Sequence, residues 1–188
     1  MNATRLFVLG SLANGGPMHG HQIRLAAQVD RTELWADVKP GSLYGALRRM
    51  ASEGVIETVR TEQKGNRPER TIYRITEAGR AEFKMLRDKA LRDTRIAPDS
   101  VNLALLYCGD LSEEQMRAAI ELRRQNLAAE LASWEQLHTD AAPWLTGLEP
   151  LGFEHQLMRI KAEIAWHDLV LDRLPKMFAG RDGAGEQA

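Results

Sequence analysis

The sequence predicts a mainly helical protein with one small β-hairpin in its first half. Apolar residues recur at helical spacing along most of the 188 residues, whereas residues 55–63 and 71–76 are rich in Val, Ile, Thr and Tyr. Charge also divides the chain. Residues 1–95 carry 17 basic and 11 acidic groups, a net charge of +6, and residues 96–188 carry 8 basic and 15 acidic groups, a net charge of −7. This division indicates an anionic partner for the first half and a different task for the second.

The composition excludes several classes of protein. Hydrophobic residues make up 44% of the chain and charged residues 27%, which is typical of a globular rather than a disordered protein. No apolar run reaches the roughly 18 residues that span a bilayer, and the N-terminus lacks the pattern of a secretory signal. A single cysteine, Cys108, excludes an intrachain disulfide and a multi-cysteine metal site. We therefore expect a cytoplasmic protein without a membrane segment.

Two helices are predicted at the start of the chain. The first holds the apolar run of residues 6–12 and ends at the Asn-Gly-Gly-Pro segment of residues 14–17. The second spans residues 18–29. Its apolar positions at helical spacing are Ile23, Leu25, Ala26 and Val29.

A third helix is predicted directly after Pro40. Ser42 or Gly41 is its expected N-cap, and Gly54 its expected C-terminal stop. Its apolar face has the spacing i, i+4, i+7, which leaves three polar side chains beside or opposite that face. The apolar residues are Leu43, Leu47 and Met50, and the polar ones are Tyr44, Arg48 and Arg49.

The hairpin and a fourth helix complete the first half. Residues 64–70, which contain Gly, Asn and Pro, are expected to form the tip between the two strands. Thr76 is expected to cap a helix that runs to about residue 92, with Phe83 and Leu86 on its apolar side. Three helices, two strands and a helix in this order are typical of a winged helix-turn-helix domain, which we place at residues 1–95.

The second half predicts helices alone. A short apolar helix is expected at residues 101–107, and the capping box at Ser112 and Gln115 predicts a long helix to about residue 137. The last helix carries a sustained heptad seam, which needs another helix against it. The seam consists of Phe153, Leu157, Ile160, Ile164, His167, Leu171, Leu174 and Phe178. We expect residues 96–179 to form a C-terminal helical dimerisation and effector domain, and residues 180–188 to form a disordered tail.

The basic residues of the first half point to DNA. A protein binds a duplex by neutralising phosphates with Lys and Arg, a helix fits the major groove, and a basic loop can follow the backbone or enter the minor groove. The alternative is that the arginines of the third helix form only a solvated face. The candidate DNA-contacting residues are Lys39, Ser42, Tyr44, Arg48, Arg49, Lys64, Asn66, Arg67 and Arg70.

Five motifs in order resemble the PadR family of bacterial transcriptional regulators, over roughly residues 4–90. They are LFVLGSL at residues 6–12, GPMHGHQI at 16–23, KPGSLYGALRRM at 39–50, EGVI at 53–56 and YRITEAG at 73–79. The resemblance implies a winged-helix repressor with a C-terminal helical domain that forms a homodimer. It also implies that residues 40–50 are the recognition helix and its lead-in, and that residues 64–70 are the wing tip. One departure is His21, because the family usually has Tyr at this position.

Several aromatic, histidine and cysteine residues could have either a functional or a purely structural role. A small aromatic effector could stack on aromatic side chains of the second half, including Trp144, although packing and dimer-interface roles are the alternative. The candidate effector-binding residues are Trp134, His138, Trp166 and His167. His19 and His21 lie at i and i+2, do not share a helix face and are expected to be a helix-start motif rather than metal ligands. We read Cys108 as a small buried hydrophobe.

We therefore expect a ligand-responsive homodimeric repressor that reads a pseudo-palindromic operator and uses no cofactor. The motifs of phosphate-binding loops, serine hydrolases and zinc proteases do not occur in the sequence, so we expect no enzyme. The alternative is a winged-helix module that binds proteins and never reads DNA, and steep loss of DNA affinity with salt would separate the two.

Overall fold

The structure is a computed structural model that describes residues 2–29, 31–36, 38–62 and 70–182. The chain divides into two compact units, Met1–Ile96 and Ala97–Ala188, which we describe one at a time. None of the helices in the described part of the chain combines the length and the apolar character of a membrane span.

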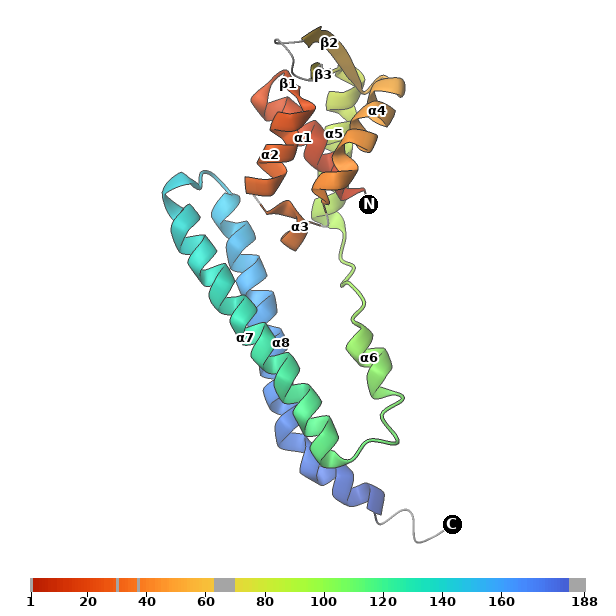
Figure 1. Ribbon diagram of the computed structural model, residues 1–188, viewed down its shortest axis with the longest axis vertical. Helices are drawn as coiled ribbons and strands as arrows, with labels where there is room; N and C mark the ends of the chain where they lie inside the picture. The colour runs from red at the N-terminus through yellow and green to blue at the C-terminus, as the bar shows by residue number, and fades with distance from the viewer. Residues whose placement is uncertain (1, 30, 37, 63–69, 183–188) are drawn as a thin grey trace. The chain divides into compact units, whose positions relative to one another are not determined.

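The first unit combines helices with a small sheet (Figure 1). Its elements are α1 (Ala3–Gly15), β1 (Met18–His19), α2 (Gly20–Val29), α3 (Thr32–Trp35), the 3₁₀ turn η1 (Pro40–Ser42), α4 (Leu43–Ser52), β2 (Ile56–Glu62), β3 (Arg70–Ile75) and α5 (Glu77–Arg92). The mainly helical fold with a β-hairpin is thus confirmed.

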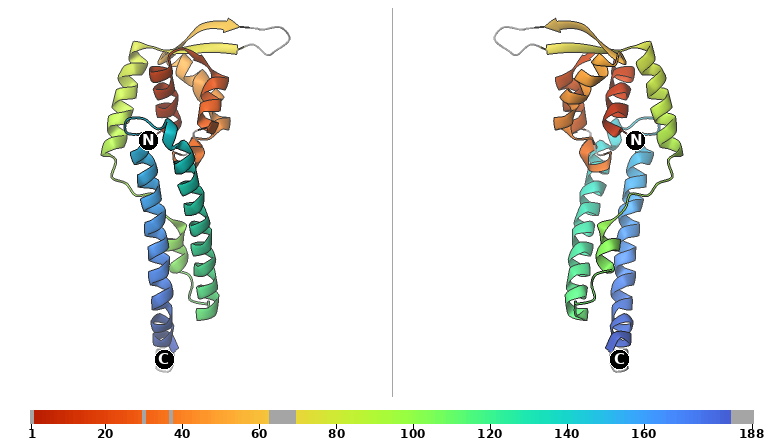
Figure 2. Two further views of the ribbon diagram at one scale, coloured as in Figure 1. Left: turned by 90° about the vertical axis from the view of Figure 1, so that its left-hand side faces the viewer. Right: turned by 90° about the vertical axis from the view of Figure 1, so that its right-hand side faces the viewer.

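The sheet has three antiparallel strands in the order β1-β3-β2, rather than the two that were predicted. Met18 pairs with Tyr73 and His19 with Ile72, so the start of the predicted second helix is a strand. The hairpin of β2 and β3 extends away from the helices of this unit (Figure 2). Its pairing shifts register between Thr58 and Arg60, which marks an irregularity in β2.

One apolar core holds the helices of the first unit together. Its fully buried members come from α1, α2, α4, the start of β2 and the segment before η1: Val8, Leu9, Leu12, Ile23, Ala27, Val38, Leu43, Leu47, Met50 and Ile56. The prediction for α2 was wrong at two positions, because Leu25 and Val29 are 49% and 69% exposed. Ala27, which the spacing argument left out, is buried in their place.

The ends of α4 and α5 follow sequence signals closely. Gly54 has φ +73°, its N–H reaches the carbonyl of Ala51, and Val55 N–H reaches the carbonyl of Met50, which together form a Schellman motif at the end of α4. Thr76 caps α5 by accepting the N–H of Gly79 at 3.1 Å. A Cβ at Gly79 would overlap the carbonyl of Val55, so only glycine allows this close approach.

The second unit consists of α6 (Ser100–Leu105), α7 (Glu113–Ala141), the 3₁₀ turn η2 (Ala142–Trp144) and α8 (Glu149–Asp182). The capping box at Ser112 and Gln115 is present at the start of α7. Every residue of the predicted seam is buried or half-buried, and Ile160, His167 and Leu174 are the fully buried ones. The expectation of disorder from residue 180 was wrong for residues 180–182, which continue α8, and residues 183–188 lie outside the described part.

Candidate nucleic-acid interface

The helix α4 separates an apolar face from a polar one. Leu43, Leu47 and Met50 are buried against the core, as the spacing predicts. Tyr44 is 43% exposed, and Arg48 and Arg49 are exposed as well. Because Tyr44 and Arg48 are four residues apart, they lie on one face of the helix. This face presents a phenol and two guanidinium groups to solvent.

The lead-in to α4 is fixed by hydrogen bonds within the chain. The Ser42 hydroxyl donates to the carbonyl of Lys39 at 2.8 Å, so Ser42 occupies the N-cap position without capping the helix through its side chain. The buried hydroxyl of Thr32 lies within 3.3 Å of the Ala27 carbonyl and 3.4 Å of the Val38 carbonyl. Thr32 therefore ties the end of α2 to the segment that leads into α4.

The wing is described only along its strands. Lys64, Asn66 and Arg67 lie outside the described residues, so their positions stay predictions. Arg70 is exposed, but it begins β3 and pairs with Glu62 rather than belonging to an irregular tip.

The start of α2, whose polar residues were not among the predicted DNA contacts, packs against Tyr44 of α4. A Cβ at Gly20 would lie 3.0 Å from Cε1 of Tyr44, so Tyr44 packs against the backbone between His19 and His21. His21 and Arg24 project from α2, with Arg24 Nη2 3.4 Å from His21 Nδ1. His19 and Gln22 cap the start of α2 reciprocally, each accepting the backbone N–H of the other. Their spacing, His-x-x-Gln, is the signal in the sequence that could have located this end of α2.

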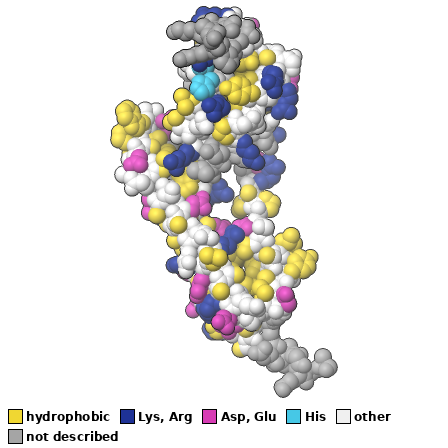
Figure 3. Space-filling model, in the orientation of Figure 1, with side chains coloured by type: hydrophobic (Ala, Val, Ile, Leu, Met, Phe, Trp, Pro, Cys, Tyr) yellow, Lys and Arg dark blue, Asp and Glu magenta, His cyan; other side chains and the backbone are white. Residues whose placement is uncertain are grey.

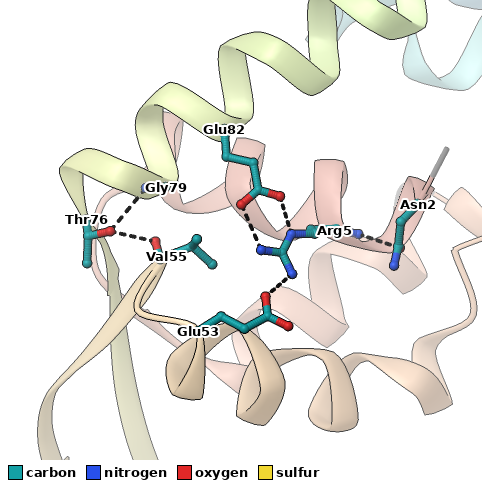
Figure 4. A network of polar contacts seen from close by, with 7 residues as sticks. All are labelled: Asn2, Arg5, Glu53, Val55, Thr76, Gly79 and Glu82. Atoms are coloured by element: carbon teal, nitrogen blue, oxygen red, sulfur yellow. Dashed lines mark hydrogen bonds and ion pairs between the residues drawn. The ribbon is translucent and has the colours of Figure 1, made fainter.

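An ion network behind α4 joins three helices (Figure 4). Arg5 of α1 donates from Nε and Nη2 to the two carboxylate oxygens of Glu82 on α5, and from Nη1 to Glu53 at the end of α4. The hydrogen bond with Glu82 is the main cause that raises the pKa of Arg5 above its ordinary range. The network fixes the end of α4 against α1 and α5.

The charge of the first unit is visible on its surface. On the face in Figure 3, Lys and Arg side chains gather over the first unit, and Asp and Glu side chains are concentrated over the second. Within the described part of the chain, no group of three His, Cys, Asp or Glu side chains is placed to hold a metal ion.

The candidate effector residues of the second unit do not form one site. Trp134 meets the ring of Phe153 edge-on at 5.9 Å, and His138 stacks on the same ring at 5.2 Å. Trp166 and His167 contact each other 13 residues further along α8, which is about 20 Å at 1.5 Å per residue. Trp144 is 81% exposed and belongs to neither group.

His167, Asp99 and Arg123 form a polar cluster in the second unit, in which both His167 and Arg123 interact electrostatically with Asp99. Its Nδ1 lies 2.7 Å from the Glu163 carbonyl, and its buried Nε2 has no hydrogen-bond partner among the described residues. Arg123 of α7 pairs with Asp99, the N-cap of α6, and its buried Nε also lacks a partner there. The Val101 N–H is the main cause that lowers the pKa of Asp99, and Arg123 contributes.

A curated protein and several solved structures are similar to this chain over most of its length. It is 23% identical over 188 residues to the Negative transcriptional regulator PadR of Bacillus subtilis (strain 168), which covers 94% of this chain and 100% of that protein. The crystal structure of Bacillus subtilis PadR in complex with operator DNA has a TM-score of 0.73 and 21% identity, and covers 93% of this chain and 98% of that one.

Two further structures share the fold. Bacillus subtilis PadR in complex with p-coumaric acid has a TM-score of 0.71 and 17% identity, and covers 92% of this chain and 96% of that one. The Vibrio cholerae virulence activator AphA has a TM-score of 0.69 and 21% identity, and covers 93% and 99%.

Residues 8–85 match the sequence profile of the Transcriptional regulator PadR-like family. The match includes β1, the whole of α4, the strands of the wing and most of α5. The predicted resemblance to this family is therefore confirmed over these residues. Over these residues, the chain is similar to the PadR-like family of transcriptional regulators.

Proposed function

We propose that this protein is a ligand-responsive transcriptional repressor that binds a pseudo-palindromic operator as a homodimer. The observation that carries the proposal is the polar face of α4, where Tyr44, Arg48 and Arg49 are exposed on a helix whose other face is buried in the core. A relative with the same fold is named a negative regulator and was crystallised with operator DNA, which supports the assignment.

In this proposal α4 enters the major groove. Arg48 and Arg49 can make paired hydrogen bonds to guanine, and Lys39 and Ser42 lie where the chain approaches α4 and suit phosphate contacts. The wing follows the flanking backbone through Arg70 and the predicted residues Lys64, Asn66 and Arg67. Binding to chromosomal DNA would place the protein in the cytoplasm.

The second unit supplies the dimer in the same proposal. None of the six residues of α6, all of them described, is buried. Leu103, Leu106 and Tyr107 are 59%, 76% and 75% exposed. Apolar side chains at this density are typical of a surface that another chain covers. We assign residues 1–95 to DNA binding and residues 96–179 to dimerisation and effector binding.

The aromatic side chains of α7 and α8 are the proposed effector-binding region. Trp134, His138 and Phe153 form one aromatic group, and Trp166 with His167 forms a second. The solved relative that holds p-coumaric acid supports an aromatic acid as the effector class. Such a ligand would favour an arrangement of the two recognition helices that does not fit the operator.

The DNA assignment is tested by fluorescence anisotropy with a duplex selected by the protein from a randomised pool. We expect Arg48→Ala and Tyr44→Ala to weaken binding by at least about tenfold, because base contacts contribute about 1–3 kcal/mol each. Arg159→Ala, which removes the same charge from an exposed position on α8, is the matched control. Weak binding without sequence preference and without steep salt dependence would favour the protein-binding module instead.

The dimer and the effector are tested with the same protein. Leu106→Glu, at the C-cap of α6, should convert dimer to monomer in light scattering coupled to gel filtration, and Leu148→Glu, at an equally exposed leucine that follows η2, should not. Addition of p-coumaric acid, the probe for aromatic acids, should release the selected duplex. Retention of the dimer by Leu106→Glu would remove α6 from the interface.

A further inference from the structure

We propose that His21 and Arg24 bind a backbone phosphate of the operator, and that protonation of His21 strengthens this contact, so that operator affinity rises as the pH falls. This inference rests on the proposed DNA-binding function and deepens it. It concerns residues of α2 that lie beside the recognition helix rather than on it.

The position of this cluster follows from the packing of Gly20. The buried Gly20 leaves room for Tyr44, and a Cβ there would lie 3.0 Å from Cε1 of Tyr44 and 3.0 Å from Cδ1 of Leu47. The half-exposed phenol of the DNA-facing helix therefore lies next to the backbone that carries both imidazoles. Figure 3 shows histidine surface beside Lys and Arg side chains on the first unit.

Hydrogen bonds fix the tautomer of His19. Its Nδ1 accepts the backbone N–H of Gln22 at 3.1 Å, while Gln22 Oε1 accepts the backbone N–H of His19 at 3.0 Å. Because a backbone N–H can only donate, Nδ1 carries no proton, and the N–H of a neutral His19 is at Nε2. Protonation of His19 would remove the acceptor that caps α2.

His21 is placed differently, because its neighbour is a cation. Its exposed ring stacks on that of His19, with centroids 6.2 Å apart and planes at 25°. Arg24 Nη2 lies 3.4 Å from His21 Nδ1, which accepts from it only while that nitrogen is unprotonated. Besides His19 and Arg24, the titratable group that packs against this segment from α4 is the Tyr44 phenol.

Protonation of His21 therefore changes what the cluster can bind. Nδ1 of the imidazolium becomes a donor that faces the Arg24 guanidinium, so their direct contact is lost and the two cations repel each other. A phosphate between them would accept from both groups and screen this repulsion. Imidazole is the side chain whose ordinary titration falls between pH 5 and 8. Because DNA favours the protonated form, binding takes up a proton and is tighter at lower pH.

The test measures the affinity of the full-length protein for the selected duplex at pH 6.0 and pH 8.0, over a series of salt concentrations. We expect wild type to bind about two- to fivefold more tightly per protomer at pH 6.0, the range of an exposed ion pair. The plot of log affinity against log salt should be steeper at pH 6.0 by about 0.9 per additional phosphate neutralised.

Three variants test whether His21 causes the pH dependence of DNA binding. His21→Gln keeps a polar side chain that does not titrate, so it should show equal salt slopes at both pH values. His19→Asn keeps a good N-cap and should retain the pH dependence of wild type. His155→Gln removes an exposed histidine of α8 and is the matched control. Sensitivity to pH that survives in His21→Gln, or wild-type salt slopes that are equal at the two pH values, would overturn the inference.

The same data separate this inference from the proposed function. Salt-dependent binding at pH 8.0 that is lost in Arg48→Ala, together with no change toward pH 6.0, would contradict the role of His21 alone. No salt-dependent binding to any duplex at either pH would contradict both.

Discussion

Arg5 and Glu82 form a two-pronged ion pair that joins the first helix of the chain to α5. Nε and Nη2 of Arg5 each donate to one oxygen of Glu82, the second at 2.7 Å, and both side chains are only about one-fifth exposed. The remaining Nη1 donates to Glu53, which follows α4 directly. One guanidinium thus holds the three helices whose mutual placement presents the polar face of α4.

We expect Arg5→Met to lower the free energy of unfolding by about 1–3 kcal/mol, because it leaves the half-buried Glu82 without its partner. Chemical denaturation followed by circular dichroism measures this change. The control is Arg74→Met, which breaks the exposed cross-strand pair with Glu57 and should cost at most about 1 kcal/mol. Equal losses in the two variants would show that burial of the Arg5 network contributes nothing.

Gly20→Ala should weaken operator binding more than it lowers stability. The added methyl group would meet Tyr44 and Leu47 at 3.0 Å, and the half-exposed Tyr44 can yield by moving away from the surface it presents. Fluorescence anisotropy should show weaker DNA binding. The loss of binding free energy should be larger than the loss of unfolding free energy measured by denaturation. Gly152→Ala, in α8 with open space around its Cα, should leave DNA affinity unchanged and stabilise the helix by up to about 1 kcal/mol.

Local signals in the sequence predicted much of this fold, because the residues that decide it are neighbours in the chain. The capping box at Ser112, the cap at Thr76 and the stop at Gly54 each act within one helical turn. The heptad spacing likewise predicts which face of α8 is buried, because a repeat of this length gives the helix one apolar face whatever packs against it.

The features that the sequence did not predict depend on distant partners. β1 is only two residues long and exists because Met18 and His19 pair with residues more than 50 positions away. The buried face of α2 consists of Gly20, Ile23 and Ala27, at i, i+3 and i+7, and Leu25 lies outside it although it is the larger apolar side chain. The pairing of His21 with Arg24 was available as an i, i+3 spacing, but nothing local shows that it borders Tyr44.

Asp99→Asn should remove an acid-sensitive contribution to stability while keeping the cap of α6. The amide oxygen can still accept the N–H of Val101, which Asp99 accepts at 2.9 Å, but the charge that pairs with Arg123 is lost. Because the pair is about one-third exposed, we expect a loss of no more than about 1 kcal/mol at pH 7.

The pH dependence of this loss has a defined sign. The pKa of Asp99 is lowered below its ordinary value of 3.8, so the carboxylate stabilises the fold above that value and ceases to do so as the pH falls through the folded-state pKa. The difference between wild type and Asp99→Asn, measured by denaturation from pH 7 to pH 2, should therefore shrink in acid. A difference that grows in acid would contradict the assignment.

His167→Leu should raise the stability of the second unit. His167 occupies a seam position, is fully buried, and keeps Nε2 without a partner among the described residues, which costs about 1–3 kcal/mol for a buried polar group. Leucine fills the same seam without that cost, although it gives up the 2.7 Å contact with the Glu163 carbonyl. We therefore expect a net gain of about 1 kcal/mol in denaturation followed by the fluorescence of Trp134 and Trp166.

His155→Leu, at an exposed position of the same helix, should change stability by less than about 0.5 kcal/mol. A loss of stability in His167→Leu would show instead that its imidazole has a partner, such as a bound water or an effector, that holds the cluster with Arg123 together.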